Sequence, residues 1–214
     1  MRKLPAKEQF VIKGPAGDLE LLLESPQDLP PVGCAVVCHP HPVHGGTMQN
    51  KVAHTLARSF VGAGFAALRF NFRGVGKSAG TFDEGQGEVD DVLRAIEWMR
   101  DQAPELPLWL AGFSFGAAMA IRAAVTAQPD GLVSIAPAVS RFAVDFDSQP
   151  TCPWLIVQGD EDELVDIDET IAWVNGLEPG PELDVLPGTE HFFHGKLVQL
   201  REIVESFVSE NQTS

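Results

Sequence analysis

Short apolar runs alternate with longer amphipathic segments along most of this 214-residue chain. The runs are rich in β-branched and aromatic residues and lie near glycine or proline, which is typical of buried strands. They cover residues 34–38, 65–71, 108–112, 132–136, 154–158 and 183–186. This alternation predicts a mostly parallel sheet with helices on both faces, that is, a three-layer α/β/α sandwich.

The segments between these runs predict the helices. Residues 47–61, 87–100 and 197–208 carry apolar side chains at three- and four-residue spacing, so one face of each helix can pack on the sheet. A fourth segment, 114–127, is rich in alanine, which suits a helix packed closely against strands. Residues 10–13 and 19–24 are separated by glycine and proline and predict an antiparallel hairpin at one edge. We expect one domain over residues 1–214, with about eight strands and about five or six helices.

The charge balance narrows the classes of partner. The chain has 30 Asp plus Glu against 15 Lys plus Arg, a formal net charge of −15. Such a surface repels phosphate backbones and anionic lipid headgroups, so neither nucleic acid nor a membrane is an expected partner. The three cysteines form no CxxC pair or disulfide framework, and no apolar run has signal-peptide or membrane-spanning length. These features predict a cytoplasmic protein, and both a monomer and a homodimer stay open.

A G-x-S-x-G motif lies where a predicted strand meets a predicted helix, in the segment LWLAGFSFG, residues 108–116. A serine on such a tight turn needs small neighbours, and Gly112 and Gly116 provide them. Ser114 is therefore the predicted nucleophile. The backbone N–H of Phe115, at the start of the helix, is predicted to face a developing oxyanion.

A serine hydroxyl needs a base, and the base needs a carboxylate that fixes its tautomer. With this motif the chain order is serine, acid, histidine. The run QGDEDE, residues 158–163, supplies four carboxylates directly after a predicted strand. C-terminal to it, the only histidines are His191 and His194, in the loop LPGTEHFFHG. The residues alone leave the choice within each set open.

The segments GFSFG, QGDEDELV and GTEHFF together resemble the α/β-hydrolase superfamily and, within it, the small dienelactone-hydrolase-like bacterial serine hydrolases. HPHPVHGGTMQNKV and LRFNFRGVGKSAG are similar to that family too, so the resemblance covers nearly the whole chain in the expected order. It implies the α/β-hydrolase fold, with Asp162 as the acid and His191 as the base. Asp160 and His194 are the alternatives.

The resemblance also implies a second oxyanion donor in the loop after the third strand, at the N–H of His41. The flanking residues Pro40 and Pro42 have no N–H, which supports this choice. The implied activity is hydrolysis of a small-molecule acyl substrate, an ester or thioester, through an acyl-enzyme, with no metal and no other cofactor. Lactones and small amides are compatible as well.

Many relatives carry a lid between the strand that follows the nucleophile helix and the next strand. Here residues 137–153 leave little chain for one, so we expect a shallow, open site without a sizeable lid. Phe113, Phe192 and Phe193 are the predicted apolar lining, with Phe115 and Phe142 also available.

Two other functional hypotheses compete with the serine hydrolase. HPHPVH, residues 39–44, fits H-x-H-x-x-H after a strand and could form a zinc site, although Val43 stands where metallo-β-lactamases have an aspartate. A non-catalytic binding module on the same scaffold is the other hypothesis, because a fold alone fixes no activity.

The roles of the His41, His44 and His194 side chains stay open. The glycines at 74 and 76 with Ala79 fit a dinucleotide fingerprint, but no helix is predicted to follow, so a surface loop is expected.

Overall fold

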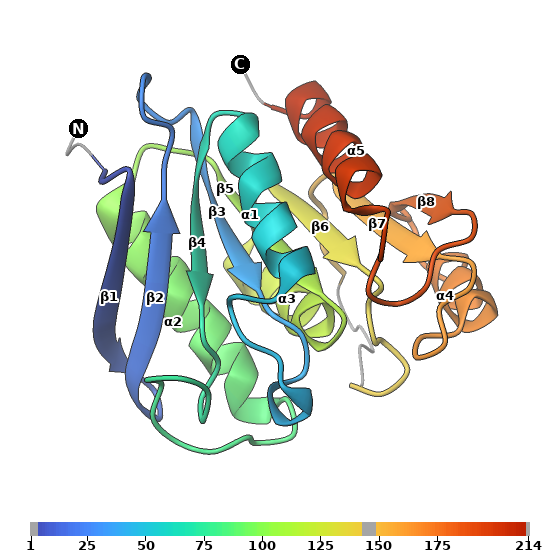
Figure 1. Ribbon diagram of the computed structural model, residues 1–214, viewed down its shortest axis with the longest axis horizontal. Coiled ribbons are helices and arrows are strands. Elements are labelled where there is room, and N and C mark those ends of the chain that lie inside the picture. Colours follow the sequence, from blue (N-terminus) through green and yellow to red (C-terminus); the bar gives the residue numbers. More distant parts are fainter. Residues whose placement is uncertain (1–3, 143–148, 213–214) are drawn as a thin grey trace.

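The computed structural model describes residues 4–142 and 149–212 (Figure 1). The described residues form an eight-stranded sheet in the order β1-β2-β4-β3-β5-β6-β7-β8. The strands are β1 Lys7–Gly14, β2 Gly17–Glu24, β3 Gly33–Cys38, β4 Phe65–Phe70, β5 Leu108–Phe113, β6 Gly131–Ile135, β7 Trp154–Gly159 and β8 Glu182–Leu186. Strand β2 pairs antiparallel with both β1 and β4, and the pairs from β4 to β8 are parallel. The predicted mostly parallel sheet with an antiparallel edge is confirmed.

Helices cover both faces of this sheet (Figure 1). They are α1 Lys51–Gly62, α2 Gln86–Gln102, α3 Phe115–Ala127, α4 Ile167–Val174 and α5 Leu197–Glu210. Helices α1 and α5 lie on one face, and α2 and α3 lie on the other. The three-layer sandwich expected from the sequence is therefore the observed architecture. None of the helices in the described part of the chain is long and apolar enough to cross a membrane.

Two clusters of buried side chains fill the spaces between the layers. Along β5, Leu108 and Leu110 face the cluster under α2 and α3, whereas Trp109, Ala111 and Phe113 face the cluster under α1 and α5. This period-two alternation explains why the strand is apolar throughout, because both of its faces are covered.

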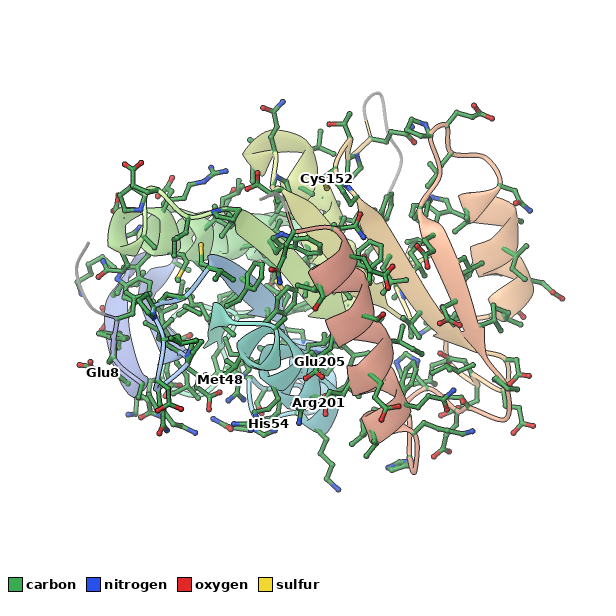
Figure 2. The ribbon with its side chains drawn as sticks, turned by 90° about the horizontal axis from the view of Figure 1, so that it is seen from above. Glu8, Met48, His54, Cys152, Arg201 and Glu205 are labelled. Carbon is green, nitrogen blue, oxygen red and sulfur yellow. The ribbon has the colours of Figure 1, made fainter. Side chains whose placement is uncertain are left out.

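Helices α1 and α5 lie side by side, with Arg201 and Glu205 on the α5 surface (Figure 2). At the end of α1, a Cβ atom on Gly62 would lie 2.3 Å from Oε1 of Glu205, so the absence of a side chain permits this approach. Arg201 holds the same carboxylate with a 2.6 Å hydrogen bond from Nε. The loop before each of these two helices carries candidate site residues, His41 and His191.

The helix boundaries differ from prediction at two places. Helix α1 begins at Lys51 rather than at residue 47, because the side chain of Asn50 accepts hydrogen bonds from the N–H groups of Val52 and Ala53 and ends the preceding turn. The sequence analysis did not locate helix α4, because its eight residues are too few to show a clear apolar periodicity. The glycine-rich segment 74–79 is a loop, as expected, and α2 begins only at Gln86.

Candidate active site

Ser114 lies on the turn between β5 and α3 with φ 55° and ψ −117°, a conformation that is strained for a residue with a side chain. Its N–H donates to the carbonyl of Ile135 at 2.8 Å, which anchors the turn to β6. A Cβ on Gly112 would lie 2.3 Å from the carbonyl oxygen of Gly116, and one on Gly116 would lie 2.3 Å from that of His39. Both glycines are thus required by close backbone approach, as the motif predicts.

Three side chains from separate loops meet at the carboxyl ends of the parallel strands. Ser114 follows β5, Asp162 follows β7 and His191 follows β8. His191 Nε2 lies 3.0 Å from Ser114 Oγ, and His191 Nδ1 lies 2.8 Å from Asp162 Oδ2. The His191 side chain is 3% exposed and that of Asp162 is fully buried. The arrangement holds a largely buried imidazole between a hydroxyl and a carboxylate.

The carboxylate of Asp162 is fully engaged in hydrogen bonds. Oδ1 accepts from the backbone N–H groups of Leu164 at 2.9 Å and Val165 at 2.8 Å. Oδ2 accepts from His191 and also from Nε2 of Gln158 at 2.8 Å. Burial raises the pKa of Asp162, but the hydrogen bonds from His191 and from the backbone outweigh it, so the pKa lies below its ordinary value. The group is held as a carboxylate.

Gln158 is a site residue that the sequence analysis missed. It is fully buried at the end of β7, and its amide donates to the oxygen of Asp162 that also faces His191. Its own Oε1 has no hydrogen-bond partner among the described residues. The signal was present in WLIVQG, where one polar side chain interrupts an otherwise apolar buried strand.

The alternative acid and base lie outside this arrangement. Asp160 is exposed, and its Oδ1 accepts a 3.4 Å hydrogen bond from the N–H of Thr189. His194 is exposed and pairs with Glu190. Of the four acidic residues after β7, it is Asp162 that bonds the ring of His191.

A cavity of about 350 Å³ opens at Ser114 and His191. Its walls are formed by Pro40, His41, His44, Gly45, Gly46, Asn50, Ser114, Phe115, Ala138, Arg141, Phe142, Leu164, Val165, His191 and Phe192. As expected, the described residues of the 137–153 connection form no helix or strand that could serve as a sizeable lid; residues 143–148 lie outside the described part of the chain.

The predicted aromatic lining is only partly correct. Phe192 is 41% exposed and lines the cavity. Phe115 and Phe142 are also part of the cavity wall. Phe113 and Phe193 are fully buried in the core under α1 and α5, so their assignment to substrate contact is wrong. The Phe113 side chain points to the α1 and α5 side of β5, and its ring lies 4.9 Å from the ring of His191. It supports the imidazole from the core.

The loop after β3 does not bring three imidazoles together. His39 is fully buried, with Nδ1 at 2.6 Å from the carbonyl of Pro40 and Nε2 accepting from the N–H of Phe72 at 3.0 Å. Burial lowers the pKa of His39 to about 4, so the ring is neutral and both nitrogens are engaged. Within the described residues no cluster of histidine, cysteine or acidic side chains is arranged to hold a metal ion. A zinc site formed by all three histidines of HPHPVH would require His39 to give up one of these contacts.

His41 and His44, in contrast, have rings 4.5 Å apart in the cavity wall. The pKa of His41 is lowered, first by burial and then by the positive charges of His44 and Arg141. The carbonyl of His41 accepts hydrogen bonds from the N–H groups of His44 and Gly46 at 3.2 and 3.0 Å, which fixes the turn that carries it.

Similarity to known proteins covers the whole site. Residues 35–145 match the family described as serine aminopeptidase, S33. An uncharacterised protein of Rickettsia prowazekii is 34% identical over 211 residues, which cover 94% of this chain and 88% of that protein. An α/β serine hydrolase homologue from Coxiella burnetii superposes with a TM-score of 0.90 at 43% identity, over 96% of this chain and 99% of the other. A Xanthomonas campestris protein described as an α/β serine hydrolase without a lid gives 0.93 at 42% identity, over 100% and 99%.

Proposed function

The chain belongs to the α/β serine hydrolases, and from this we propose that it is a metal-independent acyl hydrolase that cleaves a small ester or thioester through an acyl-enzyme. One observation carries the proposal. His191 Nε2 is 3.0 Å from Ser114 Oγ while His191 Nδ1 is 2.8 Å from Asp162 Oδ2. Those contacts suit a hydroxyl nucleophile, a general base and an orienting carboxylate.

In the proposed first step, Ser114 Oγ attacks the substrate carbonyl carbon and its proton passes to His191 Nε2. The tetrahedral intermediate collapses, the bond to the leaving oxygen or sulfur breaks, and His191 returns the proton to that atom. A water molecule then attacks the acyl-enzyme with His191 as base, and the acid and the free Ser114 hydroxyl are released. Asp162 keeps His191 in the tautomer with the proton on Nδ1 and stabilises the imidazolium that forms.

The proposed oxyanion donors are the backbone N–H groups of Phe115 and His41. Phe115 is the first residue of α3, so its N–H has no acceptor inside the helix, and the helix dipole favours negative charge there. His41 lies across the cavity on a turn held by its own carbonyl. Phe192 and Phe142 supply apolar surface for the rest of the substrate.

Kinetics of a Ser114→Ala variant test the proposal. Turnover of 4-nitrophenyl acetate should fall by about 10⁴-fold or more, because the nucleophile is lost while the remaining site is intact. Ser140→Ala is the matched control, since Ser140 is an exposed serine near Arg141 in the cavity wall and should keep wild-type rates. A Ser114→Ala protein that keeps wild-type rates would sink the mechanism. A folded wild-type protein without any esterase activity would favour the binding-module hypothesis.

A further inference from the structure

The cavity differs in charge from the rest of the molecule. The chain carries a formal net charge of −15. The cavity wall nevertheless contains Arg141, and it contains no aspartate or glutamate among the described residues that form it. A wall with a guanidinium and without acidic side chains attracts anions even in so acidic a protein.

Arg141 forms no ion pair with another described residue. The ion pairs of the described residues involve Arg69, Arg73, Arg94 and Arg201, but none involves Arg141. Its side chain is exposed, and its charge lies close enough to His41 to contribute to the lowered pKa of that ring. With no ion-pair partner among the described residues, this guanidinium at the cavity can bind a ligand.

Aromatic packing holds the segment that carries Arg141 in place. The ring of the next residue, Phe142, lies 4.8 Å from that of Phe115 and 5.7 Å from that of His41. Phe115 is fully buried at the start of α3. The guanidinium is therefore tethered beside the nucleophile turn rather than on a distant part of the surface.

The carboxylates near Ser114 and His191 already form hydrogen bonds or ion pairs with groups other than Arg141. Asp162 has both oxygens in hydrogen bonds, and Glu163 Oε2 accepts from the backbone N–H of His191 at 3.2 Å. Glu190 pairs with His194. None of these three acids forms part of the cavity wall, so they leave Arg141 available.

Building on the proposed hydrolase function, we propose that the substrate is a small ester or thioester bearing an anionic group, a carboxylate or a phosphate, that Arg141 binds while the scissile carbonyl meets Ser114. The planar guanidinium can bind either anion through two parallel N–H donors. A cavity of about 350 Å³ suits a small molecule of this kind. The remaining wall, with Phe142 and Phe192, is suited to the apolar chain between the two ends.

Two esters of matched length and leaving group test the inference: mono-4-nitrophenyl glutarate, which is anionic, and 4-nitrophenyl pentanoate, which is neutral. The wild-type protein should have the higher kcat/KM for the glutarate ester. Arg141→Gln should lower the ratio of the two kcat/KM values by about tenfold or more, the usual effect of losing one charge-assisted hydrogen bond. Arg141→Glu should bring the ratio below that of Arg141→Gln, because a carboxylate repels the anionic ester.

Arg58→Gln is the matched control. Arg58 is an exposed arginine on α1 that does not line the cavity, so this variant removes the same charge and should leave the ratio unchanged.

Inhibition by glutarate and by phenyl phosphate identifies the anion. Arg141-dependent inhibition by glutarate supports a carboxylate, and Arg141-dependent inhibition by phenyl phosphate supports a phosphate. Inhibition by neither contradicts the inference.

The result that overturns the inference is a wild-type ratio near one that Arg141→Gln does not change. The proposed function is then untouched, provided that both esters are hydrolysed and that Ser114→Ala abolishes their turnover. If Ser114→Ala retains turnover, the function itself has failed, so the two failures are distinguishable.

Discussion

At the scale of single residues, the hydrogen-bond donors around Asp162 require a carboxylate at this position. Each of its two oxygens faces two donors, so no orientation of an asparagine amide can satisfy the site. Asp162→Asn should lower kcat for 4-nitrophenyl acetate by about 10⁴-fold, because the tautomer of His191 is no longer fixed. The rate should be measured at a temperature where circular dichroism shows the variant folded.

Asp160→Asn is the control for that variant. Asp160 is exposed, and its carboxylate accepts a hydrogen bond from the N–H of Thr189, outside the contacts of His191, so its replacement should change kcat little. A large loss in Asp160→Asn together with near wild-type rates in Asp162→Asn would contradict the assignment.

Gln158 gives a second prediction at this scale. Gln158→Leu removes the amide that shares Asp162 Oδ2 with His191, and it also removes a buried oxygen that has no partner in the described structure. We expect kcat/KM to fall about tenfold while the free energy of unfolding changes by less than about 1 kcal/mol. Urea unfolding and steady-state kinetics on the same preparation measure both. Unchanged kinetics would show that Gln158 does not position Asp162.

Sequence patterns located the turn that carries Ser114 and the loops that carry Asp162 and His191, but not the orientation of the neighbouring side chains. The G-x-S-x-G motif requires small residues at 112 and 116, and the structure bears that out through close backbone contacts. Phe113 and Phe193 could not be assigned correctly, because the face toward which each side chain points is set by tertiary packing. Arg141 was missed because nothing in the local sequence distinguishes an arginine at a cavity from one on open surface.

At the scale of elements, the β5–turn–α3 unit is the part most sensitive to substitution. Gly112→Ala would place a Cβ 2.3 Å from the carbonyl oxygen of Gly116, and backbone cannot move aside cheaply. We expect Gly112→Ala to lower the free energy of unfolding by about 1–3 kcal/mol or more. Gly176→Ala is the matched control, because the nearest atom there is 3.3 Å away. Equal urea midpoints for the two variants would contradict this account of the turn.

The element boundaries show where local sequence was sufficient. All the strands were predicted at nearly the right residues, because apolar runs bounded by glycine and proline fit few other structures. The start of α1 was wrong because Asn50 caps the helix after an apolar residue, Met48, that fits the helical period but lies in the preceding turn. Helix α4 is held by its Asp166 cap and by packing of Trp173 on the core rather than by a long amphipathic pattern.

At the scale of the whole molecule, groups whose pKa is lowered in the folded protein make stability fall on acidification, and His39, Asp162 and Glu24 are three of them. The pKa of His39 is lowered to about 4 by burial, so the unfolded chain binds a proton between about pH 6.5 and 4 that the folded chain does not. Stability is then lost as the pH falls through that window. The pKa values of Asp162 and Glu24 are also below their ordinary values, because hydrogen bonds and ion pairs outweigh burial, and these groups act in the same direction at lower pH.

His39→Gln isolates the first contribution. The wild-type free energy of unfolding should fall between pH 7 and pH 4.5 by an amount on the order of 2–3 kcal/mol more than that of His39→Gln, measured by urea titration at both pH values. The comparison cancels the other titrating groups, which the two proteins share. Identical pH dependence in the two proteins would contradict a neutral buried His39.

The central claim is that the hydroxyl of Ser114 is activated by its contact with His191. Treatment with diisopropyl fluorophosphate, followed by peptide mapping with mass spectrometry, tests it most directly. The account predicts one phosphoryl adduct per chain, located on Ser114, with esterase activity lost in parallel and no adduct in His191→Ala. Full activity after treatment without an adduct, or an adduct on another residue that tracks the loss of activity, would contradict it.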